Sequence, residues 1–449
     1  MVEAAAGRAR PRRSWPVPTW RLGAAAAVLS IVAAILPPAA PWGLAVVYGV
    51  LLVAAIVDWS MAVAPARVGV VRTLPASLTL GQVGTIRWEV ANPARRGVRV
   101  AVADELAPAL QAGSRRARLE VPPGGVAATT TDVRPLRRGD FCPAELVVRV
   151  DGPLGLMARQ ASRCDPSLVR VLPPFRSRQE AELRIDRARI LEVGLRSAKA
   201  RGGGTEFEQL REYVVDDEFR RIDWAATARA GRPIVRSFRA ERNQVVLSLL
   251  DTGRTMAGRV AGVPRLEHAM DAVMMLTAVA TRLGDRAGLV AFDRQIRAVV
   301  QPTQARAQFG RVVEAMYRLE PELVESDYRR AFTETLVRFR RRALLVILTE
   351  LADQAVQETL LRDLPQVARS HLVLIGAVRD PDVQRWARYD PTDAGAAYRK
   401  AAAIAALTDR RRLVATLAAM GATVVDALPG QLAPQLADAY LRAKATGRL

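Results

Sequence analysis

Acidic side chains in the second half of this sequence follow apolar runs, where oxygen ligands for a metal ion could gather. They are Asp251 after VVLSLL, Glu350 after ALLVILT, and Asp327 before a helical pattern, with hydroxyl groups nearby at Thr252, Thr255, Ser326 and Thr349. Hard oxygen ligands of this kind suit Mg²⁺. Carboxylates at strand ends also act as helix caps or turn formers, so the pattern leaves both interpretations open.

Motifs of the common catalytic sites are missing from the sequence. It has no G-x-x-x-x-G-K-[ST], no H-E-x-x-H and no G-x-S-x-G. His268 and His371 lie far apart, which argues against a histidine zinc site, and Cys142 and Cys164 form no C-x-x-C pair. We therefore expect a protein that is not an enzyme; a hydrolase of unknown type is a weaker alternative.

Residues 202–255 contain the densest mixture of charged, aromatic and glycine residues in the chain. Apolar residues that recur every three or four positions predict a short amphipathic helix in this stretch; they are Phe207, Leu210, Tyr213 and Val214. The candidate partner-binding residues follow: Arg220, Arg221, Asp223, Trp224 and Arg229. Exposed arginine and tryptophan are typical of binding hot spots, whereas guanidinium and carboxylate groups this close also form ion-paired surface turns.

The net charge of the 449 residues is +21, and it comes almost wholly from arginine. The arginines are spread over the chain among many acids and do not form one stripe interleaved with aromatic residues, which disfavours nucleic acid as a partner. Contact with an anionic membrane face is the preferred interpretation. A compositional bias towards alanine and arginine would give the same charge without a function.

Two uncharged runs near the amino end predict a transmembrane helical hairpin over residues 22–59, with helices at about 22–36 and 42–57. Residues 1–21 form a basic amino end, arginines also follow the second run, and the intervening loop has none. This distribution places both ends in the cytoplasm and the soluble domains on the cytoplasmic side of the inner membrane.

Alternating and β-branched runs separated by turn signals predict a small antiparallel β-sandwich over residues 67–172. A charged connector and the first part of the dense stretch, up to residue 243, follow over 173–243. Over 244–445, apolar strands alternate with helices, which predicts an α/β domain with a mostly parallel, Rossmann-type sheet. Ligands of such sheets collect at the carboxyl ends of the strands, which is where Asp251 and Glu350 are expected.

The chain contains several rare residue types in a defined order: Gly204-Thr205-Glu206-Phe207, Leu210-Arg211-Glu212-Tyr213, Asp217, Arg220-Arg221-Ile222-Asp223-Trp224, Ala228-Arg229, the strand ending at Asp251, and the earlier Asp151-Gly152-Pro153-Leu154-Gly155-Leu156. This order resembles the bacterial domain of unknown function 58 (DUF58) family over nearly the full chain. The resemblance implies a membrane protein whose carboxyl part is similar to a von Willebrand factor A domain. It also implies a MoxR-type AAA+ ATPase as partner, in assembly or maturation of other proteins.

The resemblance to von Willebrand factor A domains implies a site that can be compared with this sequence. Such domains hold a divalent metal with Asp-x-Ser-x-Ser and two further loops. Here the segment reads Asp251-Thr252-Gly253-Arg254-Thr255, so a glycine stands where a hydroxyl ligand is expected, and Ser326-Asp327 and Thr349-Glu350 would fill the other loops. The implied metal set is degenerate: Asp251, Thr255, Ser326, Asp327 and Glu350.

Two hypotheses of function follow from these patterns. The first is a membrane-anchored protein-interaction module that needs no cofactor. The second is a magnesium-dependent ligand or protein receptor that uses the degenerate metal site. Because the missing hydroxyl at Gly253 weakens an octahedral Mg²⁺ site, the first is preferred.

Overall fold

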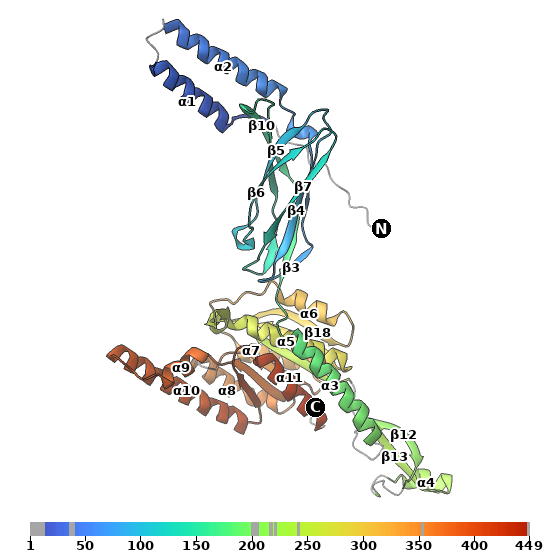
Figure 1. The fold of residues 1–449 in the computed structure, drawn as a ribbon. Coiled ribbons are helices and arrows are strands. Elements are labelled where there is room, and N and C mark those ends of the chain that lie inside the picture. The colour runs from blue at the N-terminus through green and yellow to red at the C-terminus, as the bar shows by residue number, and fades with distance from the viewer. Residues whose placement is uncertain are drawn as a thin grey trace. The chain divides into compact units, whose positions relative to one another are not determined.

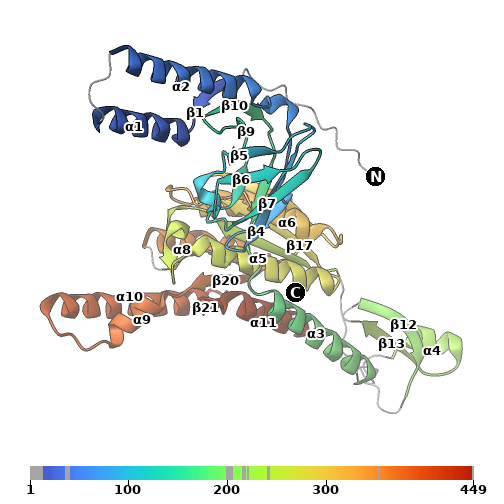
Figure 2. The ribbon, with the colours of Figure 1, turned by 45° about the horizontal axis from the view of Figure 1, so that its top comes forward.

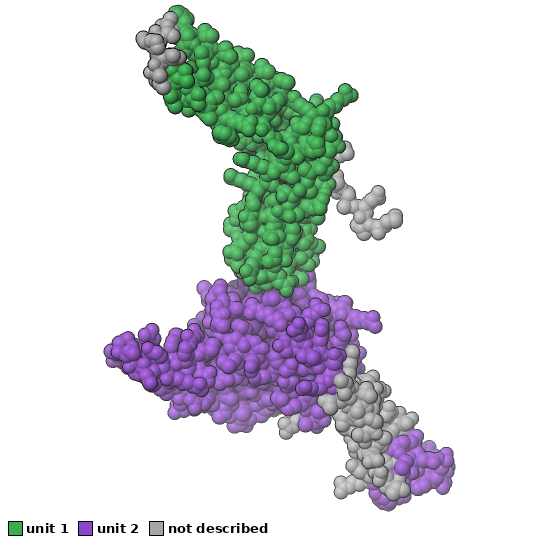
Figure 3. Space-filling model, in the orientation of Figure 1, with its two compact units in different colours: residues 1–172 green, residues 173–449 purple. Residues whose placement is uncertain are grey.

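The computed structural model describes residues 14–35, 41–198, 206–214, 219, 222–239, 243–351 and 354–446. The chain divides into two compact units, residues 1–172 and residues 173–449, which Figure 3 colours separately.

Two apolar helices lie near the start of the first unit, α1 (Trp20–Ile35) and α2 (Pro41–Met61). They pack against each other, and the Ser30 and Tyr48 hydroxyl groups lie 2.5 Å apart between them (Figure 1). Among the described helices, one segment, Trp42–Arg67 with 26 residues, is long and apolar enough to cross a membrane, whereas the apolar Trp20–Val32 is shorter. Helices in soluble cores pass the same test, so the transmembrane hairpin stays a prediction.

The rest of the first unit is built from β-strands in three sheets. The five-stranded sheet has the order β1-β10-β9-β5-β6, and the two three-stranded sheets have the orders β2-β4-β7 and β3-β11-β8. The strands are β1 (Trp15–Pro18), β2 (Gly69–Thr73), β3 (Ser77–Thr79), β4 (Gly84–Ala91), β5 (Val98–Asp104), β6 (Arg116–Val121), β7 (Val126–Val133), β8 (Gly139–Phe141), β9 (Glu145–Asp151), β10 (Met157–Cys164) and β11 (Val169–Leu172). Two features differ from the sequence-based expectation: β1 comes from the basic amino end, and β11 pairs parallel with β3.

Alternate residues of these strands point into one shared core. Along β5 every second side chain is buried, which is the period of two expected for a sheet with one face in the core. Trp88 is fully buried there, and its indole nitrogen donates to Asp104 at 2.8 Å. Asp104 also pairs with the buried Arg72 at 2.7 Å, so this internal charge is compensated.

The start of α1 and the end of α2 are attached to one turn between β9 and β10, which has the sequence Asp151-Gly152-Pro153-Leu154-Gly155-Leu156. We call the β-strands of the first unit, with their turns, the β-domain. The buried carboxylate of Asp58, near the end of α2, accepts from the backbone N–H groups of Leu154, Leu156 and Met157 at 2.7, 2.7 and 2.8 Å. Just before α1, the backbone N–H of Thr19 donates to the Leu156 carbonyl at 3.0 Å. A Cβ at Gly152 would lie 2.4 Å from the Asp58 Cγ, so only glycine allows this approach.

The second unit contains a six-stranded sheet with the order β18-β17-β14-β19-β20-β21. Its strands are β14 (Val245–Asp251), β17 (Arg286–Phe292), β18 (Ile296–Thr303), β19 (Leu344–Leu348), β20 (Leu372–Val378) and β21 (Thr423–Ala427). All neighbouring pairs are parallel except β17 and β18. In chain order this is 3-2-1-4-5-6, the doubly wound arrangement.

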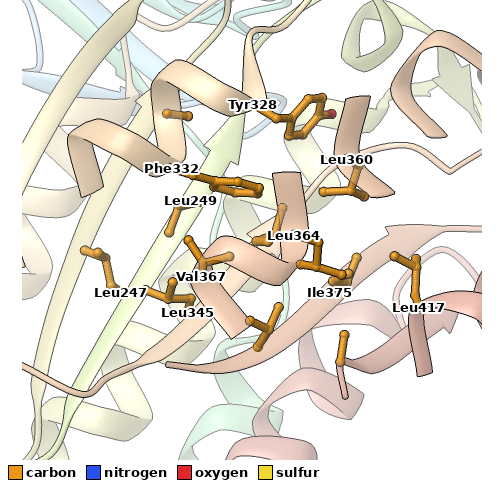
Figure 4. Packing of buried hydrophobic residues seen from close by; sticks show 14 of the residues in the cluster. Leu247, Leu249, Tyr328, Phe332, Leu345, Leu360, Leu364, Val367, Ile375 and Leu417 are labelled. Atoms are coloured by element: carbon orange, nitrogen blue, oxygen red, sulfur yellow. The ribbon is translucent and has the colours of Figure 1, made fainter. Parts of the chain in front are cut away.

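Helices cover both faces of this sheet (Figures 1 and 2). They are α5 (Arg265–Arg282), α6 (Gln308–Met316), α7 (Tyr328–Arg338), α8 (Gln354–Ala368), α10 (Ala394–Ala419) and α11 (Leu432–Ala445). A further helix, α9 (Pro381–Arg388), packs against α10. Ile375 packs in a core with α7, α8 and α10 residues, shown in Figure 4, while a Cβ at the next residue, Gly376, would meet Leu432 and Leu436 of α11. Since successive strand residues face opposite sides, α10 and α11 lie on opposite faces. The antiparallel β18 and the helix α9 were not expected from the sequence.

The described part of the dense stretch before β14 forms a small module outside the six-stranded sheet. Helix α3 (Arg178–Ala198) leads to β12 (Glu206–Glu212), α4 (Trp224–Ala230) and β13 (Ile234–Arg239), and β12 pairs antiparallel with β13. The prediction of an amphipathic helix at 207–214 is therefore wrong, because β12 occupies most of that segment. Phe207 and Leu210 stand three positions apart in the sequence, a spacing that imitates a helical period, whereas the segment pairs as a strand with a register shift between Phe207 and Gln209.

Candidate functional site

Asp251 is the centre of a buried hydrogen-bond network at the carboxyl end of β14. One of its oxygens, Oδ1, accepts from the Gly253 backbone N–H at 2.8 Å and from Ser326 Oγ at 2.5 Å. The other, Oδ2, accepts from the Tyr328 hydroxyl at 2.8 Å and from Thr349 Oγ1 at 2.7 Å. The side chain is completely buried. These four donors compensate the carboxylate without a cation.

The glycine at position 253 is required by the geometry of this network. A Cβ there would lie 2.1 Å from Ser326 Oγ and 2.9 Å from the Val324 carbonyl oxygen. The Ser326 hydroxyl thus occupies the space that a serine side chain at 253 would need. The missing hydroxyl is consequently replaced by a hydroxyl from another loop, which donates to Asp251.

Tyr328 contributes a buried phenol to the Asp251 network. Its ring is fully buried and contacts Phe292 edge-on, with centroids 5.5 Å apart. Its hydroxyl lies 2.6 Å from Thr349 Oγ1, so Tyr328, Thr349 and Asp251 form a closed triangle. Burial, and then the Asp251 charge, raise the pKa of Tyr328 well above its usual range. Tyr328 therefore stays a neutral donor.

Glu350, a second predicted metal ligand, belongs to a separate group of ion pairs. Its carboxylate contacts Arg265 Nε at 2.6 Å and also pairs with Arg410. Arg410 also pairs with Asp426 at 2.8 Å. Burial lowers the pKa of Arg410, but the hydrogen bonds to Asp426 and the charge of Glu350 outweigh this effect and raise it overall. Glu350 thus neutralises arginines that link β19 to α5 and α10.

The remaining predicted metal ligands take other positions. Asp327 caps α7 by accepting from the Arg330 backbone N–H at 2.9 Å. Thr255 lies half-buried in a 3-10 turn, Arg254–Ala257. Of the five predicted ligands, Asp251 and Ser326 are joined by a direct hydrogen bond. Both side chains therefore already have a hydrogen-bond partner within the protein. These residues do not fit a Mg²⁺ site, because Asp251 has its acceptor positions filled by protein donors.

Three of the five predicted partner-binding residues, Asp223, Trp224 and Arg229, lie at α4. Arg220 and Arg221 are outside the described residues. Asp223 caps α4 by accepting from the backbone N–H groups of Ala225 and Ala226 at 3.1 and 3.0 Å. Trp224 follows directly and is 62% exposed, and Arg229 is exposed at the other end of the helix. The cap orders the turn that presents Trp224.

Phe219 accompanies Trp224 on this surface. It is 68% exposed, and the two rings meet edge to face with centroids 5.7 Å apart. Two large exposed aromatic side chains in contact form an apolar patch that water solvates poorly. Neither Phe219 nor Tyr328 is among the functional residues predicted from the sequence. Their signals were a phenylalanine next to the Arg-Arg-Ile-Asp-Trp motif and a tyrosine directly after Ser326-Asp327.

Comparisons with solved structures return low-similarity matches. A Salmonella α2-macroglobulin reacted with methylamine is 21% identical, with a TM-score of 0.19, over 24% of this chain and 7% of that chain. The native conformation of an E. coli α2-macroglobulin is 22% identical, with the same TM-score and coverage. This chain thus spans a small part of those proteins, and a likeness this low carries no argument about fold or function.

No curated protein matches the sequence. A family description, "Protein of unknown function DUF58", matches residues 209–387, which include β13, the Asp251 network and most of the six-stranded sheet. This match supports the resemblance drawn from the Arg-Arg-Ile-Asp-Trp motif and from the strand that ends at Asp251. Residues 209–387 of this chain are therefore similar to the DUF58 family.

Proposed function

We propose that this chain is a membrane-anchored, non-enzymatic protein-interaction module, which presents a von Willebrand factor A-like domain to the cytoplasm. The observation that carries the proposal is the exposed Phe219–Trp224 pair on the α4 module. Tryptophan is enriched among residues that dominate binding energy, and contact with a partner would remove both rings from water. The proposed partner is a MoxR-type AAA+ ATPase, which the family resemblance implies.

The chemistry of the Asp251 network supports binding over metal chemistry. A receptor that uses a metal needs a carboxylate with free acceptor positions beside open coordination sites. Here four protein groups already donate hydrogen bonds to the two carboxylate oxygens of Asp251. The network fixes the loops after β14 and β19 and the start of α7, so it stabilises the domain.

Attachment of the helical pair to the β-domain supports the proposed anchor. Asp58 near the end of α2 and Thr19 before α1 bond the same turn, so the β-domain holds both helices at their bases. The orientation can be tested on Cys142 and Cys164, which are both exposed. A membrane-impermeant maleimide is expected to label them in inside-out vesicles and not in intact cells. Labelling in intact cells would contradict the cytoplasmic placement.

Co-purification tests the docking surface. The full-length protein is solubilised in detergent and recovered with the MoxR-type ATPase as wild type, Phe219→Ala and Trp224→Ala. Both variants are expected to lose the ATPase. The matched control is Tyr398→Ala, because Tyr398 is an aromatic residue that is 79% exposed on α10, away from this module. Equal recovery of the ATPase with all variants would refute the assigned docking surface.

A further inference from the structure

The described part of the second unit contains a large arginine-rich pocket at the open edge of its sheet. The pocket has a volume of about 950 Å³ and is lined by the edge strand β21 and by α9, α10 and α11. Strand β21 pairs with β20 and ends the strand order, so among the described residues no strand pairs with its other edge. Figure 2 shows β21 between α10 and α11. Because these helices lie on opposite faces of the sheet, the pocket follows the strand edge.

Charges in this pocket are unbalanced. Its two acids are already paired, Asp426 with Arg410 at 2.8 Å and Asp438 with Arg184 at 2.8 Å. Four further arginines line the pocket without an ion pair to any described residue: Arg379, Arg388, Arg411 and Arg442. The pocket therefore has a positive charge that no described acid neutralises.

Arg379 gives a second indication that the pocket suits an anionic group. It follows β20, and its Nη2 donates to the Asp426 carbonyl oxygen at 3.2 Å. Its Nε is buried and has no hydrogen-bond partner among the described residues. Buried polar atoms are rarely left without a partner. A carboxylate entering the pocket could accept from this guanidinium group.

We propose that this pocket binds an extended acidic segment of a partner protein, which adds a strand to the open edge of β21 while its carboxylates pair with the unpaired arginines. Backbone hydrogen bonds to the edge give affinity in this mode, and side-chain pockets give specificity. Carboxylates fit guanidinium groups in a bidentate manner. The proposal does not depend on the Phe219–Trp224 surface, and the two sites can fail independently.

The test uses the full-length protein in detergent and a fluorescein-labelled peptide of alternating glutamate and valine, followed by fluorescence anisotropy. Saturable binding is expected, weaker at high salt because the pairs are partly exposed. Arg411→Glu is expected to weaken it at least tenfold. The matched control is Arg412→Glu, since Arg412 is the next residue on α10 and pairs with Asp409 at 3.4 Å outside the pocket. Trp224→Ala is expected to leave peptide binding unchanged, which separates this site from the docking surface.

A second probe distinguishes strand addition from simple charge attraction. This probe is the same peptide with alternate backbone nitrogens methylated. It keeps its charge but cannot donate all the backbone hydrogen bonds that pair it with a strand. It is expected to bind at least tenfold more weakly. Equal binding of the methylated peptide, equal binding to Arg411→Glu, tighter binding of polyphosphate than of the peptide, or no binding at millimolar peptide would each overturn the proposal.

Discussion

Replacing Tyr328 with phenylalanine tests whether the Asp251 network is a structural cluster. The change removes one hydroxyl group and leaves the buried ring against Phe292. The hydroxyl donates to Asp251 Oδ2 at 2.8 Å, and a hydrogen bond to a charged group contributes about 1.5–3 kcal/mol. Thr349, Ser326 and the Gly253 N–H still compensate the carboxylate. The expected loss is therefore about 2 kcal/mol of unfolding free energy.

Thermal unfolding of the full-length protein in detergent, with and without millimolar Mg²⁺, measures this effect. Tyr328→Phe is expected to lower the Tm by a few degrees, and Mg²⁺ is expected to leave the wild-type Tm unchanged. Thr335→Val is the matched control, because Thr335 is buried on the same helix and its hydroxyl has no partner among the described residues. Its Tm is expected to stay near the wild-type value. An unchanged Tm in Tyr328→Phe, or a wild-type protein stabilised by Mg²⁺, would refute the reasoning.

Three further predictions follow from the same contacts. Because the pKa of Tyr328 is raised in the folded state, the native protein keeps this proton above pH about 10 while the unfolded chain loses it. Stability is expected to fall there by up to about 1.4 kcal/mol per pH unit, and Tyr328→Phe removes this contribution in pH-dependent melting. Gly253→Ser is expected to lower the free energy of unfolding by about 1–3 kcal/mol, because its Cβ would lie 2.1 Å from Ser326 Oγ. Adding Ser326→Ala is expected to recover part of this loss in the same melts. Asp58→Asn is expected to make the 152–157 turn cleavable in limited proteolysis, because an amide cannot accept all three N–H groups. A Tyr328→Phe melt with the wild-type pH slope, a stable Gly253→Ser, or an uncut Asp58→Asn turn would contradict the respective prediction.

Sequence patterns located the strands of the second unit well where they are buried on both faces. VVLSLL and ALLVIL are continuous apolar runs, and they form the central β14 and β19. The edge strand β18 is half-buried with mixed residues, so its period is weaker, and its antiparallel direction depends on tertiary pairing. In β12 apolar residues three positions apart in the sequence predicted a helix, whereas the segment pairs as a strand with β13.

The candidate site was partly predictable for a similar reason. The expectation that Asp251 lies at the carboxyl edge of the sheet follows from its place after an apolar run. The sequence does not reveal which donors reach Asp251, because Ser326, Tyr328 and Thr349 approach it from loops and a helix start far along the chain. Glu350 faces Arg265 and Arg410, and this pairing depends on the packing of α5 and α10.

The most direct test of the central claim is the affinity of the full-length protein in detergent for a MoxR-type AAA+ ATPase, measured by titration with wild type, Trp224→Ala and Tyr398→Ala. If the docking surface is centred on the exposed Trp224, Trp224→Ala binds the ATPase at least tenfold more weakly, since truncation of a hot-spot residue costs about 2 kcal/mol or more of binding free energy. Tyr398→Ala is expected to bind with wild-type affinity. Equal affinity for all three proteins, or no binding by the wild type, would contradict the account.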